Sequence, residues 1–453
     1  MPMIDVKLIR SDPEGIKSAM ARRGVDPSEV DQVIVADEGW RQVLAAQEAS
    51  RSAVKSLSKK FGEAKRSGDE GLAATVAEQS RIEGEKQTEL GRKAQQAEDT
   101  RRDLLLRLPN LPDPQAPQGD GPEDNPTVKW WAPFPLGDKP DATIESHFAE
   151  HQRVPHWEIG AELGILDMER GAKLSGAMFP MFRGMGATLV RALIGWALNS
   201  HSNQDGPFGA FEEVRPPTLV RTETMISTGA LPKFADDAYH LERDDLWAIP
   251  TAEVPLTSLA RDEILAQGDL PRLMTAYTPC YRREAGSAGK DTRGLLRVHE
   301  FDKVEILAYS TPGDAKAVHE ELMRRAEGLI QELGLAYRVI DLCAGDLGNS
   351  AARTYDIEVY SPGCGLWLEV SSVSWFSDYQ ARRANIRYRI EDSGTSETSG
   401  VSKELGFVHT LNGSAVAVPR VWAAIVETYR QPDGSVELPE CLVGFTGQRR
   451  TIS

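Results

Sequence analysis

The chain has 453 residues, a formal net charge of −16, and hydrophobic and charged fractions of 40% and 26%. This composition is typical of a water-soluble globular protein, and the length suffices for two or three domains. The sequence contains no apolar run of roughly 18 residues, which excludes a membrane-spanning helix. So acidic a total charge also argues against a nucleic-acid partner for the chain as a whole.

Two local features indicate the compartment. The first residues, Met1 to Gly15, place charges inside their apolar stretch and lack a secretory pattern. The four cysteines are widely spaced without a CxxC pair, so neither a zinc site nor a disulfide framework is predicted: Cys280, Cys343, Cys364 and Cys441. A cytoplasmic protein without zinc is therefore expected.

Helical signals fill the first quarter of the chain. The run Ser11–Glu14 is a helix start, and that helix should continue to about Arg23. From about residue 30 to Leu108, apolar residues recur at steps of three and four, and Gly68–Gly71 indicates a turn. Two helices of roughly 35 residues in an antiparallel coiled-coil hairpin fit this pattern, with a reach of about 50 Å.

The outgoing helix of this hairpin carries a local excess of basic residues. Only Glu48 and Glu63 are acidic in this helix between Arg41 and Arg66. A basic stripe of this kind can follow the phosphates of an RNA backbone. It can equally be a solvated helix face, and charge alone favours that simpler interpretation. The basic residues are Arg41, Arg51, Lys55, Lys59, Lys60, Lys65 and Arg66.

A change of composition follows the hairpin. Residues 109–141 are rich in Pro, Gly, Asp and Asn, so we predict a linker rather than a core element. Beyond Ala142 helical and strand patterns alternate. A long apolar helix is predicted over Met178–His201, and a strand over Phe211–Val220 with Pro217 near its end. Proline inside a strand usually marks an edge strand.

The stretch Thr278–Ile306 concentrates charge within a strand pattern. It predicts two strands joined by a long loop that Gly286, Gly289 and Gly294 punctuate. Buried charges are costly unless paired, whereas an exposed hairpin needs no apolar residues between its charges. The pattern therefore predicts the floor of a polar cleft for an anionic ligand, because guanidinium groups donate paired hydrogen bonds to phosphate or carboxylate oxygens. The charged and ionisable residues include Arg282, Arg283, Glu284, Lys290, Arg293, Arg297, His299, Glu300, Lys303 and Glu305.

This stretch closely resembles motif 2 of the class II aminoacyl-tRNA synthetases, in the version found in seryl-tRNA synthetases. The segments IPTAEVPLTS (Ile249–Ser258), LEVSS (Leu368–Ser372) and HTLNGSAVAVPR (His409–Arg420) resemble the same family in order and spacing. The resemblance covers nearly the whole chain. It implies an α+β fold, with an N-terminal antiparallel coiled-coil hairpin and an antiparallel sheet flanked by helices.

The resemblance also implies a domain plan and a reaction. Residues 1–110 would form the tRNA-binding arm (coiled coil about 30–108), residues 111–141 a linker and residues 142–453 the catalytic domain. The enzyme would activate L-serine with ATP and Mg²⁺, then transfer the seryl group to the terminal ribose of tRNA(Ser). It would work as a homodimer whose interface involves the helix and strand that precede residue 221.

Residue roles are carried over from the family motifs. Arg282, Glu369 and Arg420 would be catalytic, and Glu369 and Ser372 would hold Mg²⁺. Serine would be bound by Thr251, Ala252, Glu253, Arg282, Glu305 and Ser414. ATP would be bound by Arg282, Arg283, Glu284, Val298, Phe301, Glu369, Val370, Ser371, Ser372 and Arg420. The seven basic residues of the outgoing helix would contact tRNA.

The expected chemistry agrees with the residue types. A serine carboxylate is already ionised at neutral pH, so attack on the α-phosphate needs positioning and charge neutralisation rather than a general base. The sequence has neither a nucleophile-elbow motif nor a Walker A pattern. Structural alternatives exist for several residues: Glu369 could be a paired structural carboxylate, and Arg420 could cap a turn. Arg282 is the hardest to explain without a ligand.

Several positions depart from the usual family pattern. Arg283 stands where serine is common, and Glu300 replaces a glutamine. The segment Ser175–Phe182 lacks an arginine usual in the family. Val373, Trp375 and Phe376 occupy positions where cysteine and asparagine are frequent, and Ala415 and Pro419 replace glycines.

These departures suggest a specialised copy of the enzyme, tolerant of a seryl-adenylate-like inhibitor or serving a biosynthetic pathway. Lineage drift is the alternative. Two rival functions are a ligase that loads a carrier protein and a non-catalytic binding protein. The first predicts a reduced arm, and the second predicts loss of Arg282, Glu369 or Arg420.

Overall fold

A computed structural model describes residues 4–204, 206–285, 292–391 and 404–453. The chain divides into two compact units, Met1–Pro109 and Asn110–Ser453. Gly286, Gly289 and Lys290, which belong to the predicted cleft loop, lie outside the described residues. Among the described helices, none has the length and apolar content needed to cross a membrane.

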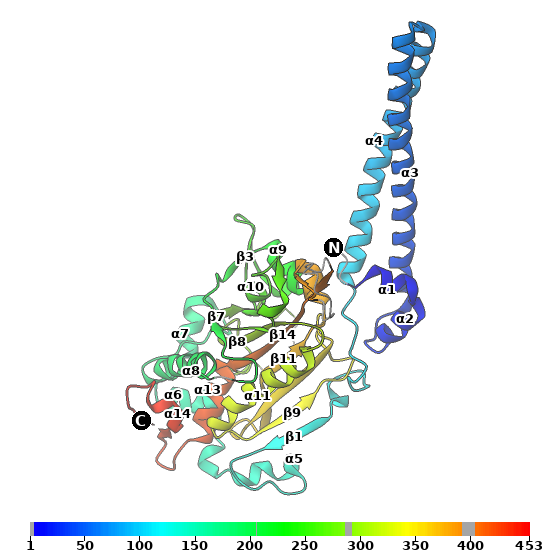
Figure 1. Cartoon of the computed structure of the whole chain (residues 1–453). Helices are drawn as coiled ribbons and strands as arrows, with labels where there is room; N and C mark the ends of the chain where they lie inside the picture. The colour runs from blue at the N-terminus through cyan, green and yellow to red at the C-terminus, as the bar shows by residue number, and fades with distance from the viewer. Residues whose placement is uncertain (1–3, 205, 286–291, 392–403) are drawn as a thin grey trace. The chain divides into compact units, whose positions relative to one another are not determined.

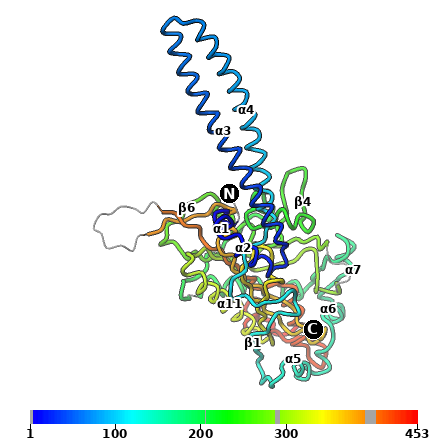
Figure 2. Tube along the Cα trace, turned by 90° about the vertical axis from the view of Figure 1, so that its right-hand side faces the viewer, coloured from blue at the N-terminus to red at the C-terminus, as the bar shows by residue number. Residues whose placement is uncertain are grey.

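The first unit is helical. Two short helices, α1 (Val6–Ser11) and α2 (Pro13–Ala21), precede the long α3 (Pro27–Ser67) and α4 (Glu70–Arg107). Figures 1 and 2 show α3 and α4 side by side along their length, so the predicted hairpin is confirmed. The turn is shorter than predicted, because the Asp69 carboxylate accepts a hydrogen bond from the Leu72 amide and starts α4 there.

A buried carboxylate ties the base of this unit together. The side chain of Asp37 on α3 is 2% exposed and is paired with Arg10, Arg41 and Arg101, from α1, α3 and α4. The Arg101 guanidinium also lies 3.7 Å from the centre of the Trp40 ring. The weak apolar seam is thus supplemented by charge pairing at one end.

The second unit is built on an eight-stranded sheet. Its strand order is β1-β9-β10-β11-β14-β8-β7-β2, and every pairing is antiparallel except β2 with β7. The strands are β1 (Thr127–Trp131), β2 (Glu212–Glu213), β7 (Arg272–Tyr281), β8 (Glu300–Ser310), β9 (Tyr337–Asp341), β10 (Arg353–Ser361), β11 (Leu366–Trp375) and β14 (His409–Ala417). Smaller sheets join β3 (Leu219–Arg221), β5 (Leu246–Ala248) and β4 (Tyr239–Leu241), and β13 (Leu405–Phe407), β12 (Arg387–Arg389) and β6 (Ile264–Ala266).

Three amphipathic helices pack on the large sheet, and the main core lies between them and the strands. They are α8 (Met185–Ser202), α11 (Ala315–Glu332) and α13 (Val418–Thr428). Strand β8 shows the division of the two faces. Val304 and Ile306 enter the core under the helices, whereas Lys303 and Glu305 point to the opposite face.

Three predictions about this unit are wrong. The stretch predicted as a linker contains β1, an edge strand of the sheet, because Thr127–Trp131 offers apolar and aromatic residues that pair with β9. The apolar helix begins at Met185 rather than at Met178, and the strand predicted over Phe211–Val220 is two short strands, β2 and β3. Pro216 and Pro217 separate them, since proline lacks the N–H that a strand ladder needs.

A β-bulge on β11 determines which residues face the site. Ser371 pairs with Ile357 and Glu369 with Glu358, so Val370 has no partner in the ladder. Without the extra residue, alternation would put Glu369 and Ser372 on opposite faces. With it, Glu369, Ser372 and Ser374 all line the same pocket, while Val370 lies in the core.

Candidate active site

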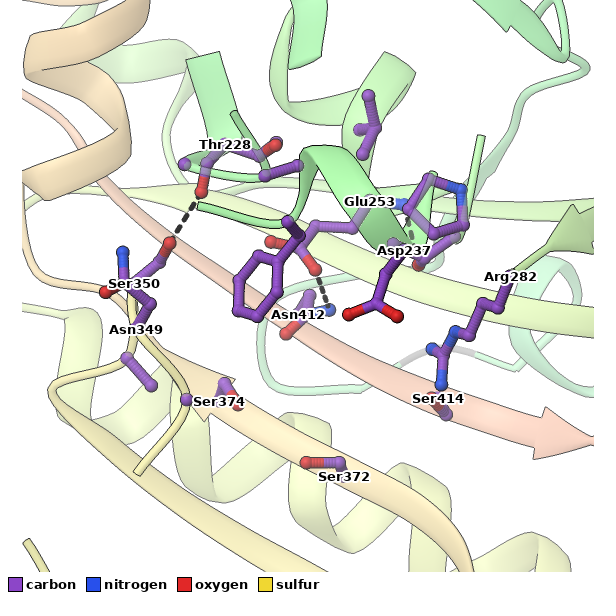
Figure 3. A pocket seen from close by; sticks show the side chains of 18 of the residues that line it. Thr228, Asp237, Glu253, Arg282, Asn349, Ser350, Ser372, Ser374, Asn412 and Ser414 are labelled. Carbon is purple, nitrogen blue, oxygen red and sulfur yellow. Dashed lines mark hydrogen bonds between the residues drawn. The ribbon is translucent and has the colours of Figure 1, made fainter. Parts of the chain in front are cut away.

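A pocket of about 560 Å³ lies on the face of the sheet opposite the three helices, and charged and polar side chains form part of its lining. Its walls come from β8, β10, β11 and β14, from α9 (Thr222–Thr228) and α10 (Glu253–Thr257), from Arg282 after β7, and from the loop around Asn349. Figure 3 shows Glu253, Asn412, Arg282 and Ser414 around its interior, with Ser372 and Ser374 on β11. Both acidic and basic side chains line it, several of them as ion pairs.

One end of the pocket is rich in carboxylates. Glu305 on β8 is fully buried and accepts hydrogen bonds from Thr251 Oγ1 at 2.8 Å and from Asn412 Nδ2 at 3.0 Å. It also forms an ion pair with Lys303, whose Nζ donates to Ser414 Oγ at 3.3 Å. The Glu305 carboxylate is therefore held in one orientation by three partners.

Glu253 at the start of α10 shares this end. Its carboxylate accepts from Gln380 Nε2 at 2.6 Å and from Asn412 Nδ2 at 3.0 Å. Burial, followed by the negative charge of Glu305, raises the pKa of Glu253 to about 7. A cationic ligand group beside Glu253 would favour its ionised form, so this end of the pocket is suited to an ammonium group.

The other end is rich in arginines. Arg282 directly follows β7, where its main-chain N–H donates to His299 O at 2.9 Å, and its side chain lines the pocket. Its guanidinium carbon lies 5.0 Å from the centre of the Phe301 ring. Arg297 and Glu284, which also line the pocket, form an ion pair across the loop. Guanidinium groups in this position fit phosphate or carboxylate oxygens.

Arg420, in the first turn of α13, joins the loop to β11. Its guanidinium donates to Glu369 O at 2.7 Å and to Leu296 O at 3.3 and 3.4 Å. It lies 3.8 Å from the Glu369 carboxylate. Pro419 before it occupies the first turn of the helix, where proline is tolerated.

An acidic cluster lies between β10 and β11. Asp356 is opposite Ser372 in the ladder, and its Oδ1 is buried without a hydrogen-bond partner. Burial, followed by the charge of Glu369, raises the pKa of Asp356, while a hydrogen bond from Ser372 lowers it.

The structure brings part of the predicted set into the pocket. Lining residues are Thr251, Glu253, Arg282, Glu284, Glu369, Ser372 and Ser414. Glu305 and Arg420 lie one contact behind this lining. Ala252, Val298, Val370 and Ser371 are buried beside it, and Arg283 is exposed, with its guanidinium 5.8 Å from the Tyr239 ring.

Sequence reasoning placed Lys303 in the cleft hairpin without giving it a role, and it missed three further polar residues of this site: Asp356, Gln380 and Asn412. Each contacts a predicted residue. Lys303 and Glu305 are two residues apart on one strand, so their side chains lie on the same face, and this spacing could have indicated a role for Lys303. Asn412 likewise lies two residues before Ser414 on one strand. However, it reaches Glu305 only because β14 pairs with β8, and such pairing between distant segments cannot be derived from local sequence.

The residues that depart from the family pattern have distinct locations. Phe376 lines the pocket, whereas Trp375 Nε1 donates to His409 Nδ1 at 3.2 Å. Val373 and Ala415 are fully buried in the main core. Of these four residues, Phe376 is therefore the one whose side chain lines the pocket.

The seven basic residues of the outgoing helix are all exposed on α3. Arg41 is paired with Asp37 at the base of the hairpin. The others, from Arg51 to Arg66, follow the helix toward its turn.

Comparison with known proteins identifies the class first. The family profile "tRNA synthetase class II core domain (G, H, P, S and T)" matches residues 238–429, which contain most of the pocket lining, and "Seryl-tRNA synthetase N-terminal domain" matches residues 3–112. The fold and the arginine-rich site are accordingly those of a class II aminoacyl-tRNA synthetase.

Full-length relatives narrow the assignment. The chain is 43% identical over 445 residues to a serine–tRNA ligase of Kosmotoga olearia (98% of this chain, 99% of the relative). It is 44% identical over 450 residues to that of Geobacillus kaustophilus (99% and 100%). It also resembles the crystal structure of seryl-tRNA synthetase from Pyrococcus horikoshii complexed with ATP, with TM-score 0.85, 35% identity and 99% of both chains covered.

The chain belongs to the seryl-tRNA synthetases, the ligases that activate serine with ATP and join it to tRNA(Ser). The sequence prediction of this family and of its fold is confirmed. Nothing in the comparisons favours a carrier-protein ligase or a non-catalytic protein.

Proposed function

We propose that the pocket holds L-serine at its carboxylate end and ATP at its arginine end, with Arg282 between the two reactants. The observation that carries this proposal is the distribution of charge around one pocket. The buried carboxylates of Glu253 and Glu305 lie at one end, where Lys303 pairs with Glu305, and Arg282 and Arg297 lie at the other, where Glu284 pairs with Arg297. The relative from Pyrococcus horikoshii, described in complex with ATP, supports a nucleotide site in the same fold.

At the serine end, the ammonium group of the substrate would lie against Glu253 and Glu305. Thr251 and Ser414 would supply polar partners, with Asn412 and Lys303 fixing the carboxylates. A site that bonds a hydroxyl rejects the analogue without it, because its buried polar groups are left unpaired. This arrangement accounts for a preference for serine over alanine.

At the nucleotide end, Arg282 would bridge the serine carboxylate and the α-phosphate. Glu284 and Phe301 would contact the adenine, with Arg283, Val298, Val370 and Ser371 around it. Arg420 would hold the distal phosphates, and its contacts with Leu296 and Glu369 keep its guanidinium in place. These roles follow the family motifs. Arg282, Glu284 and Glu369 line the pocket, whereas Val298, Val370 and Ser371 are buried beside it.

Glu369 and Ser372 fit a magnesium ion. The buried, unpartnered Oδ1 of Asp356 beside them and the raised pKa of that carboxyl describe an acidic cluster whose negative charge a cation would offset. Oxygen ligands of this kind suit a hard divalent metal. When bound, Mg²⁺ would neutralise charge on the phosphates and the departing pyrophosphate. The cofactors are then ATP and Mg²⁺.

The reaction needs two displacements. A serine carboxylate oxygen attacks the α-phosphorus, forming the mixed anhydride seryl-adenylate as the bond to pyrophosphate breaks. A hydroxyl of the terminal ribose of tRNA(Ser) then attacks the seryl carbonyl, the bond to AMP breaks, and the hydroxyl proton passes to the departing phosphate of AMP. The first step requires no side-chain base, because the serine carboxylate is already ionised. The work of Arg282 and Arg420 is orientation and charge stabilisation.

The domain roles complete the proposal. Residues 1–110 serve as the tRNA-binding arm, whose exposed basic residues would follow the RNA backbone. Residues 142–453 form the catalytic domain, and the stretch 111–141 connects them while contributing β1. The enzyme would be a cytoplasmic homodimer, with the region of α8 and the short edge strand β2 at the interface.

Serine-dependent exchange of pyrophosphate into ATP tests the assignment. The exchange should be supported by serine and reduced by about 10³-fold or more in kcat/KM for alanine. Equal exchange with the two amino acids would contradict the serine site described above.

A further inference from the structure

A buried cluster outside the pocket joins three parts of the second unit. His156 at the start of α6 (His156–Glu162), Cys364 after β10 and Glu427 near the end of α13 converge there. His156 Nδ1 lies 2.8 Å from Glu427 Oε1, and Cys364 Sγ lies 3.6 Å from Glu427 Oε1 and 3.9 Å from His156 Nδ1. His156 and Glu427 are fully buried.

The donor types of this cluster suit zinc, but its hydrogen bonds do not. The Leu295 N–H donates to His156 Nε2 at 2.9 Å, so that nitrogen carries a lone pair and the proton of the neutral ring lies on Nδ1. A metal on Nδ1 would move this proton to Nε2, where it would face the Leu295 N–H. Glu427 is also fully engaged, since its oxygens accept from the main chain of His156 and Gly363 and from Ser361 Oγ.

The hydrogen bond between the Leu295 N–H and His156 requires a glycine at position 294. Gly294 before it has a φ of +55°, and a Cβ there would lie 2.5 Å from His156 Nε2 and 2.7 Å from Trp157 Cε3. Only glycine permits the main chain to approach the imidazole this closely. The end of the loop between β7 and β8 is therefore built around the ring of His156.

The same loop segment contacts α13 twice. Leu296 O accepts hydrogen bonds from Arg420, in the first turn of α13. Leu295 N–H reaches Glu427, in the last turn of that helix, through His156. Two consecutive loop residues are thus held from both ends of one helix, and that helix is buried in the core along most of its length.

We propose that His156 and Glu427 are positioning residues for the nucleotide end of the site. They hold the Leu295 N–H, and with it the Leu296 carbonyl that orients the Arg420 guanidinium. Neither side chain lines the pocket, so both act through the loop. This inference rests on the proposed role of Arg420 in binding ATP.

We call the contacts from Glu427 through His156 to the Leu295 N–H the relay. Two substitutions at His156 test its two hydrogen bonds separately. In His156→Asn the amide N–H can still donate to Glu427, but nothing reaches the Leu295 N–H. In His156→Gln the amide oxygen reaches the position of Nε2 and can accept from Leu295. In serine-dependent ATP–pyrophosphate exchange, H156N should raise KM for ATP by about tenfold and change KM for serine by less than about twofold, and H156Q should recover most of the loss.

Controls separate this inference from its alternatives. Arg420→Ala tests the nucleotide assignment itself: a raised KM for ATP in R420A together with an unchanged value in H156N overturns the relay and leaves the proposed function standing. If R420A leaves KM for ATP unchanged, the nucleotide assignment fails instead. About one zinc per chain in the purified protein, lowered by Cys364→Ser, would also overturn the relay.

A measurement on the unaltered protein guards against variants that do not fold. Hydrogen–deuterium exchange of the full-length protein should show the Leu295 amide strongly protected, as expected for a buried N–H bonded to His156. Exchange as fast as that of an exposed loop amide would contradict the inference.

Discussion

Glu253 and Glu305 are two carboxyl groups at one end of a pocket, and a single amide, that of Asn412, donates to both at 3.0 Å. Glu305 also has Lys303 and Thr251 as partners, whereas Glu253 has Gln380. The pair is therefore unequal. The proton is expected to reside on Glu253, whose pKa burial and the neighbouring charge raise to about 7.

This pKa gives a pH dependence of serine binding. Below pH 7 Glu253 is protonated, and a substrate ammonium group must displace that proton before it gains an anionic partner. KM for serine should therefore fall as the pH rises from about 6 to about 8, by up to about tenfold per pH unit below the inflection. Glu253→Gln should remove the inflection; a flat profile for the unaltered enzyme would contradict the assignment.

The raised pKa of Glu253 also makes the free energy of unfolding depend on pH. The folded protein retains the Glu253 proton up to about pH 7, while the unfolded chain releases it near the ordinary value of 4.5. Between these values the native state binds more protons, so this group lowers the free energy of unfolding as the pH rises. A substrate ammonium group beside Glu253 would favour the ionised carboxylate and would therefore offset this loss of stability.

At the residue scale, the motifs located residues that line the pocket but not those that support them. Thr251, Arg282 and Ser414 were predicted from their segments, and all three line the pocket. Asn412 and Gln380 come from β14 and α12 (Tyr379–Ala384), and they reach Glu253 only through the packing of distant segments. Local sequence does not encode such long-range contacts.

At the element scale, the β-bulge at Val370 explains a spacing that plain alternation does not. Glu369 and Ser372 are three residues apart, and a regular strand would separate them across the sheet. A bulge adds one residue to one strand only, and it leaves no clear mark in the sequence. The sequence of β11 could therefore be predicted to form a strand, but it could not be predicted that Glu369 and Ser372 lie on the same face of the sheet.

The helical hairpin was predictable because its periodicity, its glycine turn and its length agree. Its stability is less evident from the sequence, since Leu72, an apolar residue of α4, is 49% exposed. Part of the support comes from Asp37, whose partners Arg10 and Arg101 lie 27 and 64 residues away. Burial opposes ionisation of Asp37, yet the hydrogen bonds from these arginines prevail and its pKa is lowered.

Asp37→Asn should destabilise the first unit by about 2 kcal/mol at neutral pH, because it leaves the largely buried guanidinium of Arg101 and the more exposed ones of Arg10 and Arg41 without their counter-charge. A depressed folded-state pKa adds stability above the unfolded value and loses it as the pH falls through the folded one. The difference between the two proteins in thermal unfolding should therefore shrink in acid. Asp103→Asn, at an exposed pair with Arg107, is the control and should change little. Equal effects of the two substitutions would contradict this account.

At the scale of the whole molecule, the acidic chain carries a basic helix, and the proposal gives this helix a specific task. Lys59→Glu with Lys60→Glu in the full-length protein should raise KM for tRNA in aminoacylation by about tenfold or more, with a shallower salt dependence. Serine-dependent ATP–pyrophosphate exchange should be unchanged.

Lys86→Glu with Lys93→Glu, at exposed residues of α4 that are paired with Glu83 and Glu89, gives a matched change of charge. It should affect aminoacylation less. A loss of exchange in the α3 variant would show that its effect is not confined to tRNA.

The division of the chain was only partly predictable. The composition of residues 109–141 suggested a linker, yet Thr127–Trp131 forms the edge strand β1, because a short apolar run between prolines can pair when a neighbouring strand is available. Such pairing depends on β9, more than 200 residues later. The resemblance of motifs identified the family, whereas the order of the strands required the structure.

The central claim is that Arg282 joins two anionic reactants in this pocket. Serine-dependent ATP–pyrophosphate exchange by Arg282→Ala tests it most directly, with Arg170→Ala, at an exposed pair with Asp167, as the control. The account predicts a fall of about 10²- to 10³-fold in kcat/KM for R282A and little change for R170A. Exchange by R282A at the rate of the unaltered enzyme would contradict it.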